Sequence, residues 1–317
     1  VKQSLHPVWT SQIQIGTPAK SFTVYVDTGT SYTWVISSAW IGPKNSTNNK
    51  YDALKSSTKK REKGKLDVTY TSGSRVVGPI YADTVTVGGL SASHQLFSPV
   101  NQVSGLNITR RDGLLGLALE SGPRSRNATF IDTLFHQKKI TKRIFSMYLS
   151  SGPGSELYIG GINPQKYRGE ITYLPCRSKH HWIVEGSVRA NGKESYRGGM
   201  AINSGTTLIF GPKKSVEEWW GNVFGSAPCP EEKCGGSGYF TFPCNFDASL
   251  SFKFNDREFL FAKDDLILRK LEKNKLICVG AIRAIDHDIW ILGARFMKSV
   301  YTIFDADMSR VGFATPA

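Results

Sequence analysis

Several kinds of feature are scarce in this chain of 317 residues. No apolar run reaches the roughly eighteen residues that a membrane-spanning helix needs, so we expect no membrane span. The six histidines lack the spacing of metal ligands, and the neighbouring pair His180 and His181 is interpreted as surface or strand residues. The sequence therefore suggests a globular chain with no metal site and no cofactor.

Cysteine is also scarce, and the number of cysteines is odd. By sequence separation, Cys229 with Cys234 and Cys244 with Cys278 are the natural pairs, which leaves Cys176 free. Sequence alone does not fix the connectivity of five cysteines, and five reduced thiols remain the alternative.

Three sequons make Asn45, Asn107 and Asn127 potential N-glycosylation sites, each in a polar stretch. The chain starts at Val1 without a charged and apolar leader, which suggests a mature form after removal of a leader. Together with the cysteines, these features predict a secreted protein or one of a secretory or vacuolar compartment.

Acidic residues are too few to balance the basic ones, with 26 Asp and Glu against 40 Lys and Arg and a net charge of +14. Such a positive charge is compatible with binding to nucleic acid, to an anionic wall polymer or to acidic substrates. The only dense basic run, Lys59–Lys65, has no interleaved aromatics and is expected to be a solvated loop. Because no recognisable binding module accompanies the charge, a nucleic-acid partner is not expected.

What the chain does contain is the alternation of polar and apolar residues that is typical of β-strands. It occurs at Ser11–Ile15, Ser21–Val26 and Tyr81–Val87, with further short runs later in the chain. Helical spacing occurs only at Phe130–Phe135 and at Ser215–Phe224, the latter ending in Gly225. The sequence therefore predicts an all-β fold with few short helices.

An internal repeat is the most informative feature. The segment Val24–Thr30 is repeated at Met200–Thr206. Both segments consist of three apolar residues, then Asp or Asn, then Thr or Ser, and finally Gly and Thr. A second glycine follows two apolar residues in each half, Gly116 after Asp27 by 89 residues and Gly293 after Asn203 by 90. Matching spacing predicts two duplicated lobes related by a pseudo-twofold axis. We place an N-terminal lobe at 1–165 and a C-terminal lobe at 166–317.

These residues resemble the pepsin-like aspartic proteases, and the resemblance runs from Gln12–Pro18 to Val311–Ala314. Without an early disulfide, the chain is most similar to the secreted fungal branch. The resemblance implies a bilobal pepsin-like acid protease fold with catalytic positions at Asp27 and Asn203. It also implies supporting roles for the residues around them: Thr28, Gly29, Thr30, Ser31, Ser204, Gly205, Thr206 and Thr207.

The chemistry of such a site needs two carboxylates. One activates a water molecule while the other acid donates a proton to the peptide carbonyl. At a separation of about 3 Å the two share one proton, because both cannot ionise. Asn203 stands where the family has aspartate, and an amide neither ionises nor carries that proton. We therefore expect intact folding and severely impaired catalysis.

The resemblance also places a flap over the substrate, with Tyr70, Thr71 and Ser72 at its tip and Trp34 as the packing and hydrogen-bond partner of Tyr70. Thr71 and Ser72 depart from the usual Gly-Asp-Gly-Ser motif, which alters the backbone contacts expected there. The alternative for Tyr70 and Trp34 is ordinary strand aromatics.

Three explanations of Asn203 compete. The preferred one is an active endopeptidase disabled by a deliberate acid-to-amide change; the second is a natural pseudoprotease whose groove binds peptides or acts as a decoy. The third, from another class, is a non-enzymatic wall- or polyanion-binding protein. The expected partner is an extended peptide of about six to eight residues with apolar side chains flanking the scissile bond. A statine-type inhibitor is a further candidate ligand, and we expect a monomer.

Overall fold

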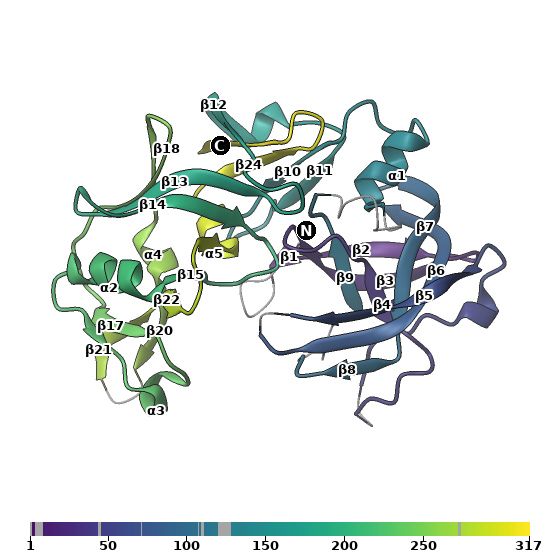
Figure 1. Ribbon diagram of the computed structural model, residues 1–317, viewed down its shortest axis with the longest axis horizontal. Coiled ribbons are helices and arrows are strands. Elements are labelled where there is room, and N and C mark those ends of the chain that lie inside the picture. Colours follow the sequence, from purple (N-terminus) through teal and green to yellow (C-terminus); the bar gives the residue numbers. More distant parts are fainter. Residues whose placement is uncertain are drawn as a thin grey trace.

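The computed structural model describes residues 2–3, 9–43, 46–70, 72–106, 108, 111–119, 128–271 and 274–317. These residues form several sheets and few short helices, so the predicted all-β class is confirmed (Figure 1). The longest helix of this part of the chain, α2 (Lys213–Gly221), has nine residues. No helix in the described ranges is long and apolar enough to cross a membrane.

A nine-stranded sheet dominates the first part of the chain. Its strands are β1 (Lys2–Gln3), β2 (Trp9–Ile15), β3 (Lys20–Asp27), β4 (Trp34–Ile36), β5 (Lys60–Thr69), β6 (Arg75–Val87), β7 (Leu90–Val100), β8 (Gln102–Ser104) and β9 (Gly113–Gly116). The predicted alternation is present in β3, where Phe22, Val24 and Val26 are fully buried. The short helices η1 (Ala53–Lys55) and α1 (Phe130–His136) accompany this sheet.

The second half contains a seven-stranded and a four-stranded sheet. The former consists of β13 (Ile183–Ala190), β14 (Lys193–Ile202), β15 (Ile209–Pro212), β18 (Leu250–Phe254), β19 (Arg257–Leu260), β22 (Ile282–Ile285) and β23 (Trp290–Leu292). The latter consists of β16 (Ala227–Pro228), β17 (Phe240–Pro243), β20 (Ile267–Leu271) and β21 (Asn274–Gly280). Helices α2, α3 (Glu231–Cys234), α4 (Lys263–Leu266) and α5 (Ala294–Met297) lie among them.

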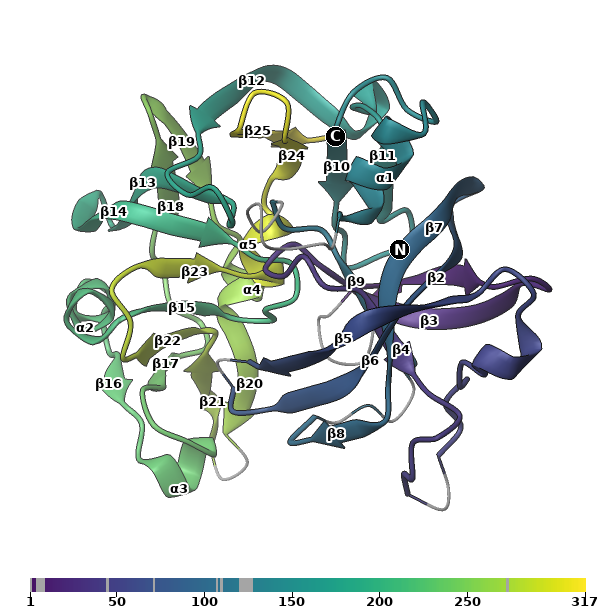
Figure 2. The same ribbon diagram turned by 45° about the vertical axis from the view of Figure 1, so that its right-hand side comes forward.

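A five-stranded sheet joins distant parts of the chain. Its strands are β10 (Ile144–Tyr148), β11 (Glu156–Ile159), β12 (Tyr167–Pro175), β24 (Tyr301–Asp305) and β25 (Arg310–Pro316), with η2 (Pro164–Lys166) between two of them. Figure 2 shows it across the top of the molecule, above the two halves. Because strands from both sides of residue 165 share this sheet, the lobe boundary stays a prediction.

The two halves of the repeat form equivalent strand arrangements. In the first half β3 runs parallel to β9, which is antiparallel to β4. In the second half β14 runs parallel to β23, which is antiparallel to β15. The repeat glycines are required here: an added Cβ would lie 2.5 Å from the Tyr32 carbonyl oxygen at Gly116 and 2.0 Å from that of Leu208 at Gly293.

Other sequence predictions have mixed outcomes. Both proposed disulfides, Cys229–Cys234 and Cys244–Cys278, are present, and Cys176 lies outside them. The basic run Lys59–Lys65 was expected to be a loop, and this was wrong, because most of it forms β5. The second predicted helix also ends earlier, at Gly221 with Asn222 as its C-cap.

The three sequon residues Asn45, Asn107 and Asn127 lie outside the described residues. Their glycosylation stays a prediction.

Candidate active site

The two candidate catalytic residues stand at equivalent strand ends. Asp27 is the last residue of β3, and its carbonyl accepts a hydrogen bond of 2.8 Å from the Leu117 N–H. Asn203 directly follows β14, and its N–H donates to the Leu292 carbonyl at 3.1 Å. Each loop is thus held by a residue that directly neighbours the second glycine of its repeat.

Reciprocal hydrogen bonds tie the two loops face to face. The Thr28 N–H donates to the Ser204 hydroxyl at 3.1 Å, and the Ser204 N–H donates to the Thr28 hydroxyl at 3.0 Å. Each hydroxyl then donates across the junction, Thr28 to the Ile202 carbonyl at 2.9 Å and Ser204 to the Val26 carbonyl at 2.8 Å. All four bonds are buried, so the pair of loops is rigidly positioned.

The side chains of Asp27 and Asn203 extend toward each other's loops. Within its own loop, the Gly29 N–H donates to Asp27 Oδ1 at 2.7 Å and the Gly205 N–H to Asn203 Oδ1 at 2.8 Å. A Cβ added to Gly29 would lie 2.2 Å from Asn203 Nδ2, and one added to Gly205 would lie 2.3 Å from Asp27 Cγ. The structure therefore brings positions 27 and 203 together across the junction of the two repeats.

The carboxyl of Asp27 is buried, with 7% of the residue exposed. Burial raises its pKa to about 6, and hydrogen bonds from the Gly29 and Gly205 N–H groups partly oppose that rise because they stabilise the carboxylate. Its counterpart Asn203 carries no titrating group. The pair thus has a single ionisable side chain, and that side chain is buried.

The remaining loop residues are held mainly by backbone hydrogen bonds. The Thr30 carbonyl accepts from the Ala118 N–H at 3.0 Å, and the Thr206 carbonyl accepts from the Ala294 N–H at 2.7 Å. The Thr207 carbonyl accepts from the Arg295 N–H at 3.3 Å. These contacts connect the loops to β9 and α5.

Ser31 is buried, and the Thr30 hydroxyl accepts a hydrogen bond from the Tyr32 N–H at 3.3 Å. The orienting roles of the hydroxyl groups of Thr30 and Thr206 toward the catalytic pair stay predictions.

The hairpin β5–β6 carries Tyr70 toward the catalytic pair. Trp34 Nε1 donates to the Tyr70 hydroxyl at 2.8 Å, which is the contact that the sequence analysis expected. Burial is the main cause that raises the pKa of Tyr70, and the charge of Asp27 raises it further, so this ring lies within electrostatic range of the carboxyl. Ser72 lies in the turn, where its hydroxyl is 2.8 Å from that of Ser74. Thr71 lies outside the described residues.

One contact of the Asp27 loop was not recognised from the sequence. The His181 imidazole, which had been interpreted as a surface or strand group, hydrogen-bonds to the Gly29 backbone; burial and the neighbouring His180 lower its pKa, and the bond to Gly29 opposes this. The next residue, Trp182, donates its Nε1–H to the Leu117 carbonyl at 2.9 Å. No local pattern in the sequence pairs His181 with Gly29, because the two residues lie in different halves of the repeat.

A metal site has no support within the described ranges, where no group of three or more His, Cys, Asp or Glu side chains is arranged to hold an ion. Cys176 is also a poor nucleophile, since burial raises its pKa to about 12.

Two repeated halves whose equivalent loops meet face to face are the arrangement of the bilobal, pepsin-like aspartic proteases. A family model described as "Eukaryotic aspartyl protease" matches residues 8–316. The chain is 34% identical over 319 residues to an aspartic protease of Phaffia rhodozyma, covering 98% of this chain and 77% of that protein.

Animal proteins are similar over comparable lengths. Cathepsin D of Rattus norvegicus is 31% identical over 349 residues, covering 100% of this chain and 82% of the relative. Pepsin A of Rhinolophus ferrumequinum is 30% identical over 321 residues, covering 96% and 80%. The chain belongs to the eukaryotic aspartyl protease family.

Proposed function

We propose that this chain is a peptide-binding member of its family in which Asn203 occupies the position of the second catalytic aspartate, so that it binds peptides far better than it cleaves them. The observation that carries the proposal is the contact across the loop junction. Gly29 lies close to the Asn203 amide and Gly205 lies close to the Asp27 carboxyl, so the two side chains face each other across the junction. Of these two side chains, only that of Asp27 can ionise.

The chemistry explains why one carboxylate is insufficient. Asp27 as a carboxylate is able to accept a proton from an attacking water molecule. Asn203 is able to offer an N–H hydrogen bond to a peptide carbonyl, but it has no proton to transfer and none to take back. Proton donation by a positioned acid contributes about 10²–10⁴-fold to such reactions, so we expect a loss of at least that size.

The ligand is an extended peptide that lies against the catalytic pair, beneath the hairpin that carries Tyr70. Two findings support this placement. The hydrogen bond from Trp34 holds the Tyr70 ring in position at the hairpin, and the chain belongs to a family of proteases. Roles for Thr71 and Ser72 in contacting the peptide backbone, a monomeric state and binding of a statine-type inhibitor are further parts of the proposal.

The cellular setting belongs to the same proposal. The disulfides Cys229–Cys234 and Cys244–Cys278 favour an oxidising compartment, in agreement with a secreted protein. The division into lobes 1–165 and 166–317 is also proposed, with the catalytic pair at the junction.

The test restores the missing acid. We predict that Asn203→Asp gains cleavage of an unfolded protein substrate by at least about 10²-fold, with a bell-shaped profile at acidic pH, because two carboxylates then share one proton. The matched control is Asn203→Asp combined with Asp27→Asn, which returns the count of carboxylates to one and should be inactive. A fresh preparation of the unaltered chain that digests protein briskly at acidic pH would contradict the proposal.

The same experiment separates the explanations of Asn203. Recovery of activity favours an endopeptidase disabled by this single change. Continued inactivity of a folded Asn203→Asp variant that still binds peptide favours a natural pseudoprotease whose site has changed at other positions.

A further inference from the structure

The hairpin β5–β6 has an outer face that the catalytic pair does not use. On its inner side Leu66, Val68 and Tyr70 pack in the cluster that contains Trp34. Successive side chains of a strand point to opposite faces, so Lys65 and Asp67 lie on the other side of β5. Opposite them on β6 are Pro79 and Val77, and Arg75 lies two residues from Val77 on the same face.

The strand β5 is strongly basic. Over its two faces, residues 59–67 contain five cations and two carboxylates, Glu62 and Asp67, and Lys60 forms an ion pair with Glu62 at 3.0 Å. Asp67 is shared by Lys65 at 3.1 Å and by Arg75 at 2.8 Å, and the hydrogen bonds from Arg75 and Lys65 lower its pKa to about 2. Within the described part of the chain, no carboxylate forms an ion pair with Lys59, Arg61 or Lys63, so the strand keeps an excess of positive charge.

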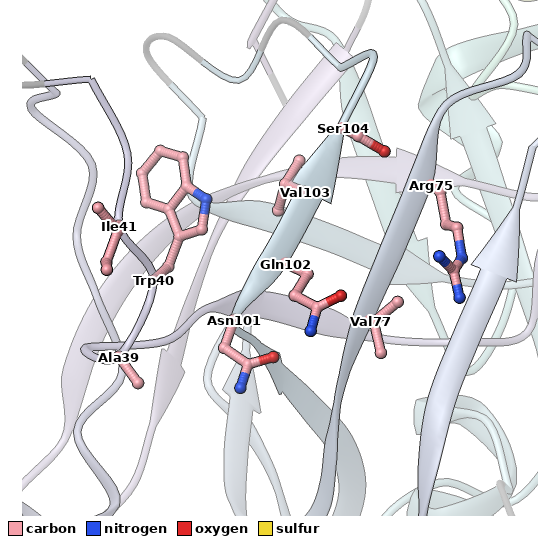
Figure 3. A pocket seen from close by; sticks show the side chains of 9 residues that line it. All are labelled: Ala39, Trp40, Ile41, Arg75, Val77, Asn101, Gln102, Val103 and Ser104. Atoms are coloured by element: carbon pink, nitrogen blue, oxygen red, sulfur yellow. The ribbon is translucent and has the colours of Figure 1, made fainter.

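A pocket of about 290 Å³ lies at the end of this face, between β6, β8 and the segment 39–41. Figure 3 shows Arg75 and Val77 on one side and Trp40 and Ile41 on the other, with β8 between them. The lining includes apolar side chains and the amides of β8, and it contains no acidic residue. Ile41 is 96% exposed, although it is a large apolar side chain. The volume is near the lower limit of about 300 Å³ for ligand pockets, which suits one or two side chains.

We propose that the outer face of the hairpin, from Lys59 to the pocket at Ile41, is a second docking surface, and that its occupant is an acidic polypeptide segment carrying an apolar side chain. The basic strand attracts the acidic residues of the segment, and the pocket receives its apolar residue. This surface is separate from the catalytic pair, and its function does not depend on whether the pair binds or cleaves a peptide.

Three observations favour this occupant over others. Among the described strands, β5 is the last of the nine-stranded sheet, so its outer edge offers backbone groups with which another polypeptide strand can pair. The apolar pocket gives no advantage to an inorganic or sugar polyanion. A second copy of this chain would bring its own row of cations to the edge, and like charges in facing strands repel.

The test measures binding of a fluorescein-labelled acidic peptide with one central leucine by anisotropy, using the full chain at low salt. We expect Lys63→Gln combined with Lys65→Gln to raise the Kd by about tenfold, and Ile41→Ser to raise it by about fivefold. The matched control is Lys213→Gln combined with Lys214→Gln on α2, which removes the same charge from exposed positions and should change the Kd less than about twofold. A peptide with glutamine in place of every acid should bind much more weakly.

Several outcomes would overturn the proposal. Equal losses in the hairpin variant and in the α2 control would show a response to net charge alone. Undiminished binding of the glutamine peptide would show that the charge is irrelevant. Full competition by inorganic polyphosphate, together with no effect of Ile41→Ser, would identify a general polyanion surface. A salt titration of the unaltered chain, whose affinity should fall as salt rises, keeps the test valid if a variant misfolds.

A neutral, apolar peptide tests binding at the catalytic pair separately from binding at the outer face of the hairpin. If the acidic peptide binds and the neutral one does not, the peptide-binding role of the catalytic pair fails while the second surface stands. The reverse pattern removes the second surface alone.

Discussion

At the residue scale, the buried carboxyl of Asp27 determines how stability responds to pH. Its folded-state pKa of about 6 lies above the value of about 3.9 for an unfolded chain, so the folded state binds the proton more tightly. The favourable contribution is present below about pH 4 and is lost as pH rises through about 6. Above that range the buried carboxylate costs about 3 kcal/mol.

We therefore predict that Asp27→Asn raises the free energy of unfolding at pH 7 by about 2–3 kcal/mol and changes it little at pH 4. The amide can keep the bond to the Gly29 N–H, as Asn203 does with Gly205. Urea denaturation at both pH values measures the effect, with Asp256→Asn at a fully exposed position as the control. An equal gain at both pH values would exclude the carboxyl as the cause.

The glycines of the two loops make a separate residue-scale prediction. Gly205→Ala places a Cβ 2.3 Å from Asp27 Cγ, so the loops must shift and the free energy of unfolding should fall by about 1–3 kcal/mol. Gly221→Ala is the matched control, since nothing lies within 4 Å of its Cβ position, and it should be neutral or slightly stabilising. Thermal unfolding of both variants compares them directly. Unchanged stability of Gly205→Ala would mean that positions 27 and 203 are farther apart than described.

At the element scale, a side-chain hydrogen bond ties Tyr70, at the turn of the hairpin β5–β6, to Trp34 of β4. Trp34→Phe removes the Nε1 donor of the 2.8 Å bond to the Tyr70 hydroxyl and keeps an aromatic ring. We expect the affinity for an extended peptide to fall about fivefold, equivalent to about 1 kcal/mol for one hydrogen bond. Tyr70→Phe removes the other partner, so the double variant should lose little more than either single one. Additive losses would show that the two rings act independently.

The elements also show what the sequence was able to predict. Alternation identified β3 because its buried residues, Phe22, Val24 and Val26, are large and apolar and its outer ones are not. The same rule missed β5, in which Leu66 is the only fully buried residue and lysines occupy the exposed positions. β5 is held in the sheet by backbone hydrogen bonds to β6, so it needs few buried apolar side chains of its own. Charge composition was therefore misinterpreted as evidence for a loop.

At the scale of the whole molecule, the repeat predicted which positions meet, but not how the halves are joined. The nearly equal spacing of Asp27 to Gly116 and of Asn203 to Gly293 was sufficient to pair the two loops. The five-stranded sheet could not be predicted in this way, since β10 pairs with β24 across about half the chain and no local pattern records it. His181 is a similar case, because its contact with the Gly29 backbone depends on how β13 approaches the first half.

This joining predicts a single cooperative unfolding transition rather than one for each half. One apolar cluster contains Val24 and Leu115 from the first half and Trp182 and Phe304 from the second, and the Thr28–Ser204 bonds cross the same junction. Ser204→Ala leaves the Thr28 N–H without its acceptor, so it should lower the midpoint of the whole transition by destabilising the protein about 1–3 kcal/mol. Calorimetry and tryptophan fluorescence should report the same midpoint before and after the change. Two separated transitions in the unaltered protein would mean that the halves are independent and that the shared sheet contributes little to holding them together.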